Sequence, residues 1–255
     1  LACLYLIGPT IVVALASVSP NATMSVPPDG FSLRWYRNFF AREEFVASLY
    51  LSLGMAFAVA TTSTLLAVLL VSTLRRAPRW IATASPVALL LPAVLPTIVL
   101  GPALLIFGAT TGLARELPGA LALLAGAHVA LTLPYAWQAV SANAAALTPT
   151  MEEAAEVAGA RRLRIFARVV VPVMIPGIVS GMTFAFLVSF DEPVVSLFVT
   201  RHDKVTLPVQ TLTYLRFRAD PTIAALSTMM SLLSLAAMLI TDRYVGLDRI
   251  MGLSR

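Results

Sequence analysis

The residues able to do chemistry gather in two short segments of this chain of 255 residues. The first runs from Glu152 to Pro172, with the sequence EEAAEVAGARRLRIFARVVVP, and holds three acids and four arginines between two long apolar blocks. Closely spaced charges of this kind form ion pairs and charge-assisted hydrogen bonds with a polar partner. The segment is therefore expected to dock against another molecule; the alternative is a solvated loop with amphipathic lipid contact.

The second segment is the acidic pair Asp191 and Glu192, followed by Pro193 and the apolar run Val194 to Val199. It lies some nineteen residues beyond Pro172, roughly 28 Å along a helix that rises ~1.5 Å per residue. Acids inside such an apolar stretch are costly unless they face protein or water. Two interpretations stay open: the pair attracts a cationic substrate along a pathway, or it breaks the helix and binds a partner's arginine or backbone amides.

No catalytic or metal site is predicted. His128 and His202 are isolated, and a histidine in an apolar helix is more often a hydrogen-bonded core residue than a metal ligand. Cys3 has no partner for a disulfide, and Ser180 has no well-placed histidine to activate it. The G-x-x-x-x-G-K-[ST] phosphate loop is absent, and Lys204, the one lysine, follows Arg-His-Asp. We expect no cofactor bound by this chain and no ATP hydrolysis by it.

The elements that position these residues are membrane-spanning helices. Hydrophobic residues make up 58% of the chain and charged residues 12%, with a mean hydropathy of +0.86, whereas a soluble domain has roughly 25% charged residues. The stretches without charge are long enough for helices of about 20 residues. The fold is therefore predicted to be all-α, with six spans near 2–19, 46–73, 81–107, 118–141, 173–199 and 222–241.

An even number of spans places both termini on one side. The loops 74–80, 142–172 and 242–255 carry ten of the eighteen basic residues, so the positive-inside rule favours these loops, and both termini, as cytoplasmic. The basic residues sit at helix ends and form no stripe with aromatics, which argues against nucleic acid as a partner. The third span holds four prolines, which are expected to kink it: Pro86, Pro92, Pro96 and Pro102.

Within the loop 142–172 the residues predict two short helices joined by a turn. Thr150 and Glu153 have the spacing of a capping box at a helix start, and Gly159 suits the left-handed turn that ends a helix. In the second helix, arginines share one side and the apolar side is formed by Leu163, Phe166, Val169 and Val170. Pro172 is expected at the entry to the next span.

The same segment resembles the permease subunits of binding-protein-dependent ABC importers. Their pattern is E-A-A, three residues, G, nine residues, a β-branched residue, one residue, an aliphatic residue and P. This chain matches it with Glu153, Ala154, Ala155, Gly159, Val169, Val171 and Pro172, with Val at two positions where Ile and Leu are more usual. Further segments resemble the spermidine/putrescine type: FSLRWYRNFF, LPAVLPTIVLG, His128 with LPY, SFDEPVVSLFV, TLPV and DPTIAALST.

This resemblance implies one transmembrane domain over 1–255, of the fold shared by MetI-like permeases, in a bacterial inner membrane. Glu153 would contact a cleft on a separate cytoplasmic ATPase and Gly159 would set the hinge, so that nucleotide-driven closure reaches the membrane helices. The partners implied are a second, different permease chain, an ATPase dimer that uses ATP and Mg²⁺, a periplasmic binding protein and membrane lipid. The loop from Thr200 to Pro221 resembles the surface that receives the binding protein.

The expected function is a non-catalytic pathway subunit for a small solute, with a polyamine such as spermidine or putrescine favoured. Asp191 and Glu192 would then be the acids along its route. Two alternatives remain open: the same importer for an amino-acid derivative, a phosphonate or iron, and a self-contained channel or intramembrane enzyme that works without an ATPase.

Overall fold

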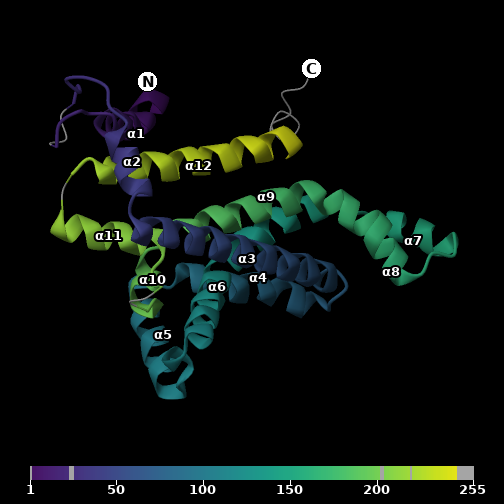
Figure 1. Cartoon of the computed structure of the whole chain (residues 1–255). Helices are drawn as coiled ribbons and strands as arrows, with labels where there is room; N and C mark the ends of the chain where they lie inside the picture. Colours follow the sequence, from purple (N-terminus) through teal and green to yellow (C-terminus); the bar gives the residue numbers. More distant parts are fainter. Residues whose placement is uncertain (1, 23–25, 202–203, 219, 246–255) are drawn as a thin grey trace. The chain divides into compact units, whose positions relative to one another are not determined.

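The structure is a computed structural model that describes residues 2–22, 26–201, 204–218 and 220–245. Within those ranges the chain is helical apart from turns and loops, and extended pairing is limited to an isolated bridge between Arg201 and Lys204, which confirms the all-α class. The helices shown in Figure 1 are α1 (Ala2–Ser17), α2 (Arg34–Phe40), α3 (Glu43–Leu74), α4 (Arg79–Val94), α5 (Thr97–Thr111), α6 (Leu117–Ala144), α7 (Pro149–Val157), α8 (Arg162–Ile165), α9 (Val171–Phe190), α10 (Val194–Val199), α11 (Leu207–Phe217) and α12 (Thr222–Val245).

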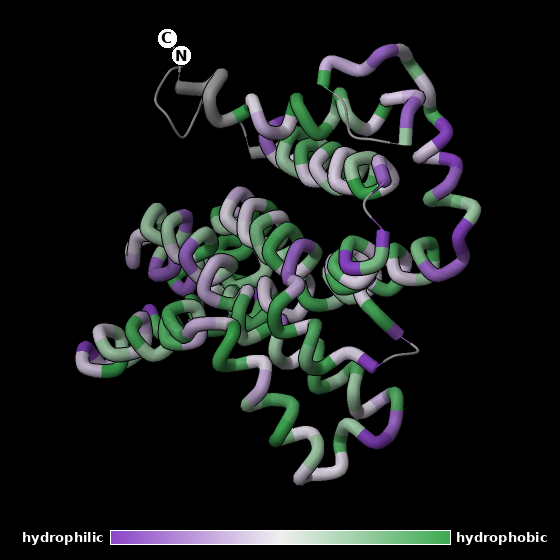
Figure 2. The backbone as a smooth tube through the Cα atoms, turned by 90° about the vertical axis from the view of Figure 1, so that its left-hand side faces the viewer, coloured by the Kyte–Doolittle hydropathy of each residue, from purple (hydrophilic) through white to green (hydrophobic). Residues whose placement is uncertain are grey.

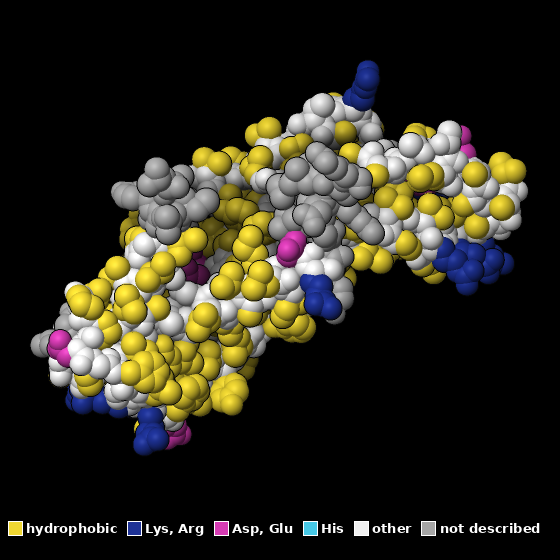
Figure 3. Space-filling view, turned by 90° about the horizontal axis from the view of Figure 1, so that it is seen from above, with side chains coloured by type: hydrophobic (Ala, Val, Ile, Leu, Met, Phe, Trp, Pro, Cys, Tyr) yellow, Lys and Arg dark blue, Asp and Glu magenta, His cyan; other side chains and the backbone are white. Residues whose placement is uncertain are grey.

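Four helical stretches of the described residues are long and apolar enough to cross a membrane: Glu43–Leu74, Leu117–Ala144, Arg162–Phe190 and Thr222–Arg243. The paired helices α4 and α5 make a fifth when they are counted as one broken span. Figure 2 shows hydrophobic residues along these helices, and Figure 3 shows hydrophobic side chains over much of the visible surface. A protein surrounded by lipid has this surface, because hydrocarbon is as apolar as a leucine side chain.

The predicted third span, 81–107, is not one helix. Its two halves, α4 and α5, meet at 88°. Leu95, between them, is extended, with φ −67° and ψ 133°, because the ring of Pro96 disfavours helical geometry in the residue before it. The expected kink is therefore confirmed at one of the four prolines, as a complete break, while the other three prolines lie inside helices.

The predicted fifth span, 173–199, is wrong at both ends. Its helix stops at Phe190, and α10 follows as a separate short helix after Pro193. At its start, α8 continues through a π-helical turn, Phe166–Val170, directly into α9, so Pro172 lies in a continuous helical segment. Pro172 has no N–H for the carbonyl of Arg168, and a widened turn is one way for a helix to accommodate that loss.

The chain forms two compact units. One contains 55–199 and 239–255, and in it α6 packs along α9 around an apolar core to which α3 contributes Ala60, Ala67, Val68 and Val71. Gly177 and Gly181 of α9 lie against the backbone of α6 at Ala139 and Ala136. Figure 1 shows α7 and α8 at one end of α9. The small residues therefore allow the two helices to approach closely.

The other unit contains 1–54 and 200–238 and is held by aromatic and polar contacts. Phe45 packs between Phe39 and Tyr214, with ring centroids 5.3 and 5.2 Å away. Trp35 donates its indole N–H to the carbonyl of Ser19 at 2.7 Å, and the backbone N–H of Leu207 donates to the hydroxyl of Ser52 at 2.7 Å. These bonds satisfy buried polar groups that would otherwise be costly.

A methyl group added at Gly177 is expected to destabilise the packing of α6 on α9. Its Cβ would lie 2.6 Å from the carbonyl oxygen of Ala139 and 2.9 Å from the amide nitrogen of Asn143, so the two helices would have to separate. We expect Gly177→Ala to lower the free energy of unfolding in detergent by about 1–3 kcal/mol, the usual cost of overpacking. Gly126→Ala, in α6, is the control, since a Cβ there meets no atom within 4 Å. Equal stability of the two variants would contradict the predicted close packing.

Candidate functional site

The segment predicted to dock a partner contains α7, which begins earlier than its sequence suggested. The predicted capping box is wrong: Thr148, extended at φ −85° and ψ 148°, is the residue before the helix, and Pro149 is its first residue. The hydroxyl of Thr150 bonds to that of Thr148, 2.8 Å away, and does not cap an amide. Pro149 favours this start because its fixed φ suits the first helical position and its missing N–H needs no partner there.

The end of α7 confirms the left-handed turn predicted at Gly159. Gly159 has φ +79°, its N–H donates to the carbonyl of Glu156 at 2.9 Å, and the N–H of Ala160 donates to that of Ala155 at 3.0 Å. This pair of bonds is the Schellman motif, which satisfies carbonyls left open at a helix end. A Cβ at Gly159 would meet nothing within 4 Å, so backbone conformation alone calls for glycine there.

Glu152 attaches α7 to the end of α3. One of its carboxylate oxygens accepts a hydrogen bond from Arg75 at 2.8 Å, and the other accepts one from Arg76. Arg75 also donates to the carbonyl of Leu147 at 3.1 Å, just before α7. The hydrogen bond from Arg76 holds the pKa of Glu152 below its usual range, helped by the charge of Arg75 and opposed by burial. Sequence reasoning missed this pairing, because the partners are more than seventy positions apart.

Glu153, the acid predicted to contact the ATPase, is exposed, and its carboxylate has no hydrogen bond or ion pair with any described residue. Ala154 beside it is exposed, Ala155 is half-buried, and Val157 is 90% exposed. The next helix corrects another prediction. Leu163, expected on a buried apolar side, is 79% exposed and Ile165 is buried in addition, whereas Val170 is buried and Phe166 and Val169 are half-buried as predicted. Glu153 and Glu156 thus present exposed acids, and they line a cavity of about 330 Å³ together with Arg75, Arg76 and Arg162.

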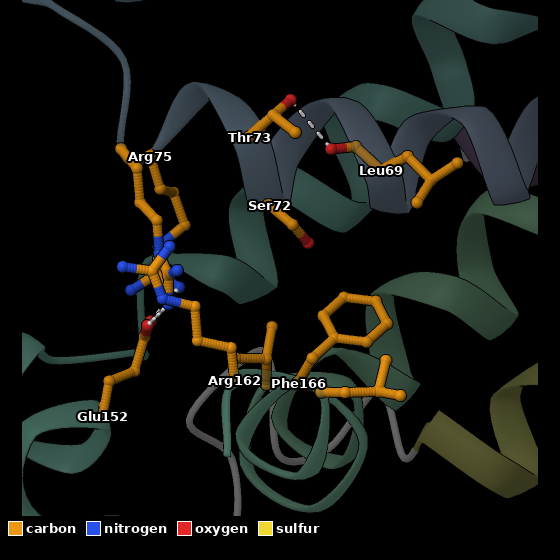
Figure 4. A pocket seen from close by; sticks show the side chains of 10 residues that line it. Leu69, Ser72, Thr73, Arg75, Glu152, Arg162 and Phe166 are labelled. Atoms are coloured by element: carbon orange, nitrogen blue, oxygen red, sulfur yellow. Dashed lines mark hydrogen bonds and ion pairs between the residues drawn. The ribbon is translucent and has the colours of Figure 1, made fainter. Parts of the chain in front are cut away.

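A cavity of about 660 Å³ lies between the last turn of α3 and the helix that begins with α8. Figure 4 shows Arg75 and Arg162 reaching toward Glu152 at its polar end, with Leu69 and Phe166 farther along its walls. The chemistry that these side chains offer is binding of a group with both charged and apolar parts.

The second candidate, the acidic pair, divides into two environments. Asp191 ends α9 and is exposed, whereas one carboxylate oxygen of Glu192 accepts hydrogen bonds from the backbone N–H groups of Val194 and Val195, at 2.8 and 2.9 Å. Glu192 therefore caps the start of α10, as one of the two open interpretations proposed. Between α9 and α10 the chain turns, so the acids lie in a helix break.

His128 is a hydrogen-bonded core residue, as expected. It is 1% exposed, and its two ring nitrogens bond to the hydroxyls of Ser189 at 2.9 Å and Ser196 at 3.0 Å. His202 lies outside the described residues. Among the residues that the structure does describe, no three of His, Cys, Asp or Glu gather as metal ligands would.

The segment expected to receive a binding protein is organised around α11. Arg216, Phe217 and Arg218 are exposed at its end. Next to them, Asp220 accepts hydrogen bonds from the hydroxyl of Tyr214 at 2.6 Å and from the N–H of Thr222 at 2.9 Å. Through Asp220, these hydrogen bonds connect Tyr214 of α11 to Thr222 at the start of α12.

Comparison with known proteins gives one family and a consistent set of relatives. The family model described as "Binding-protein-dependent transport system inner membrane component" matches residues 63–247. The putrescine transport system permease protein PotI of Escherichia coli K12 is 28% identical over 228 residues, 88% of this chain and 81% of that protein. The spermidine/putrescine transport system permease protein PotC of Haemophilus influenzae is 30% identical over 213 residues, 84% of this chain and 81% of that protein.

Among solved structures, a chain of a bacterial ABC transporter involved in the import of the acidic polysaccharide alginate has a TM-score of 0.74 at 12% identity, covering 94% of this chain and 89% of its own. The MetNI methionine ABC transporter, in an inward-facing conformation, has a TM-score of 0.62 at 18% identity, covering 82% and 96%. At these identities the likeness concerns the fold alone.

The ion pairs of Glu152 lead to a prediction about pH. A carboxyl whose pKa is lowered by folding stabilises the folded form fully above its unfolded pKa of about 4.3, and that stabilisation is lost as the pH falls through the lower, folded value. We expect Glu152→Gln to speed hydrogen exchange of the α7 amides about fivefold at pH 7, for a loss of roughly 1 kcal/mol, and the ratio to wild type to approach one toward pH 3.

Glu153→Gln is the matched control, because it removes the same charge one residue along from a side chain without a partner in the described chain. Its exchange rates should equal those of the wild type at every pH. A ratio for Glu152→Gln that stays the same from pH 7 to pH 3 would show that the ion pairs do not hold α7.

Proposed function

Because the chain belongs to the family of binding-protein-dependent transport system inner membrane components, it is a permease subunit of an ABC importer, and we propose that the solute it passes is a polyamine. The subunit is not an enzyme, since in such importers a separate ATPase hydrolyses ATP. The observation that carries the polyamine proposal is the identity of the relatives, which are putrescine and spermidine/putrescine permeases matched over most of their length.

The proposed topology has six spans in the inner membrane. The four apolar spans and the broken pair α4–α5 are joined by α1 as the first crossing. The segments 74–80 and 142–172 carry seven of the eighteen basic residues, and with the three of 242–255 this set of loops holds ten, which favours the cytoplasm for it. Both termini then lie on the cytoplasmic side.

Coupling to the ATPase is assigned to α7. Glu153, Ala154 and Ala155 form the contact, with Glu153 as its polar group, and Gly159 sets the angle between α7 and α8. Support comes from the exposure of Glu153 and from the continuous helix that leads from Arg162 through Pro172 to Phe190. A displacement of α7 would therefore be transmitted to α9 in the membrane, because the helix has no break after Arg162.

The remaining subunits are those of the ABC importers in which this family occurs. The transporter includes an ATPase and a substrate-binding protein. We assign a second, different permease chain as the other half of the pathway, an ATPase dimer that binds ATP and Mg²⁺, and the surface around α11 as the binding-protein site. Docking outside and closure of the ATPase inside would then bias the paired permeases between inward-open and outward-open states.

Asp191 is assigned to the substrate route. Glu192 is assigned a structural role, capping the start of α10 beside that route. Asp191 is exposed at the end of α9, where an anionic group attracts a cation, while Glu192 is occupied by two amides of α10. The other solutes remain alternatives: an amino-acid derivative, a phosphonate or iron. A channel or membrane enzyme without an ATPase disagrees with the family.

Reversal of charge at Glu153 is expected to uncouple the transporter. In vesicles with the complete complex, Glu153→Lys should lower ATP-dependent uptake at least tenfold, or about 1.4 kcal/mol of coupling, because an exposed carboxylate in a docking surface becomes a cation. Glu43→Lys, at an exposed acid in the first turn of α3, is the control and should retain uptake. Wild-type uptake with Glu153→Lys would refute the role of Glu153.

The substrate is tested by uptake of labelled spermidine and putrescine into the same vesicles, loaded through the cognate binding protein. We expect Asp191→Asn to reduce uptake about fivefold, as loss of one attractive charge of roughly 1 kcal/mol would. Glu192→Gln should keep most activity, since an amide oxygen can still accept the bonds that cap α10.

Uptake of a phosphonate, an amino-acid derivative or iron in place of both polyamines would overturn the substrate assignment and leave the permease role intact. If Asp191→Asn assembles normally and takes up polyamine at the wild-type rate, Asp191 does not contribute to the substrate route. The polyamine assignment itself would be unaffected.

A further inference from the structure

The cavity between α3 and α8 is built for an amphipathic anion. At one end its lining holds Arg75, Arg76 and Arg162 and one acid, Glu152, a formal charge of +2 for this lining, while Glu153 and Glu156 line the adjoining space on the other side of the same arginines. The other walls are apolar and include Leu69, Leu163 and Phe166. Its volume of about 660 Å³ is that of a ligand site rather than a packing defect.

The arginines at the polar end keep donors that no described residue uses. A guanidinium has five N–H donors. Arg76 gives one hydrogen bond to Glu152, and the guanidinium of Arg162 has no ion pair or hydrogen bond with any described residue. Figure 4 shows Arg162 pointing toward the carboxylate of Glu152 beside Arg75. Phosphate oxygens are the acceptors that match adjacent guanidinium forks.

The apolar walls distinguish a lipid from a free phosphate. Leu163 is 79% exposed although it borders the cavity, and Phe166 beside it is half-buried. The cavity also lies where the apolar span Glu43–Leu74 ends and the span Arg162–Phe190 begins, and the end of a span is where a membrane helix leaves the hydrocarbon core. A phospholipid brings an acyl chain that can cover this apolar wall, whereas a free phosphate has none.

We propose that this cavity binds one anionic phospholipid, with its phosphate on Arg76 and Arg162 and an acyl chain along Leu69, Leu163 and Phe166. Basic pockets between membrane helices bind anionic headgroups by the same chemistry. The lipid bridges the end of α3 and the start of the α8–α9 helix, beside the ion pairs of Glu152. The proposal depends on the chain's place in a membrane and not on which solute it carries.

The test is native mass spectrometry of the complete transporter, extracted from nanodiscs of phosphatidylcholine with phosphatidylglycerol. The wild type should retain phosphatidylglycerol, and Arg162→Gln should retain about fivefold less, the loss typical of one basic residue at a lipid surface. Arg164→Gln is the matched control: it is an exposed arginine two positions along that does not line the cavity, and it should retain lipid as the wild type does.

Two further arms make the result decisive. Leu163→Glu, at an exposed position where folding does not depend on the side chain, should also reduce retention, whereas millimolar inorganic phosphate should not displace the lipid. Equal retention by Arg162→Gln and Arg164→Gln, or displacement by inorganic phosphate, would overturn the proposal. Polyamine uptake is not part of the readout, so a wrong substrate assignment leaves this test unaffected.

Discussion

The close packing of α9 on α6 is the constraint on which the rest of the larger unit depends. Lipid offers no hydrophobic drive between helices, so their association relies on close contact and on polar pairs. Gly177 and Gly181 bring the two backbones together, and His128 of α6 donates to or accepts from Ser189 of α9. Because α9 is fixed along its length, both its ends are fixed too: one carries the coupling segment and the other leads to Asp191.

Helix ends near this packed pair are defined by single residues. Pro96 forces Leu95 out of helical geometry and turns α5 by 88° from α4, and Glu192 supplies the cap from which α10 starts. Pro172, by contrast, is absorbed by a π-helical turn without a break. At Pro172 the neighbouring turn widens to accommodate the missing donor, whereas at Pro96 the preceding residue is extended and the helix ends.

The sequence predicts the features that local chemistry decides. The bounds of α3, α6 and α12 follow from long apolar runs without charge, and the left-handed turn at Gly159 follows from the one residue that adopts it easily. It does not predict the features that depend on contacts between segments distant in the sequence. The pairing of Glu152 with Arg75 and Arg76 needs the end of α3 beside α7, and the true start of α7 at Pro149 outweighs the capping pattern at Thr150.

The two neighbouring acids of α7 show why those tertiary contacts matter for coupling. Successive residues of a helix point about 100° apart, so Glu152 can be held by arginines while Glu153 faces outward, and a shift of one residue would exchange their roles. A helix of nine residues is too short to keep its register alone. Pro149 and the Schellman turn at Gly159 define its ends, and the ion pairs of Glu152 then select the face that Glu153 presents. The outward orientation of Glu153 therefore depends on the ion pairs of Glu152.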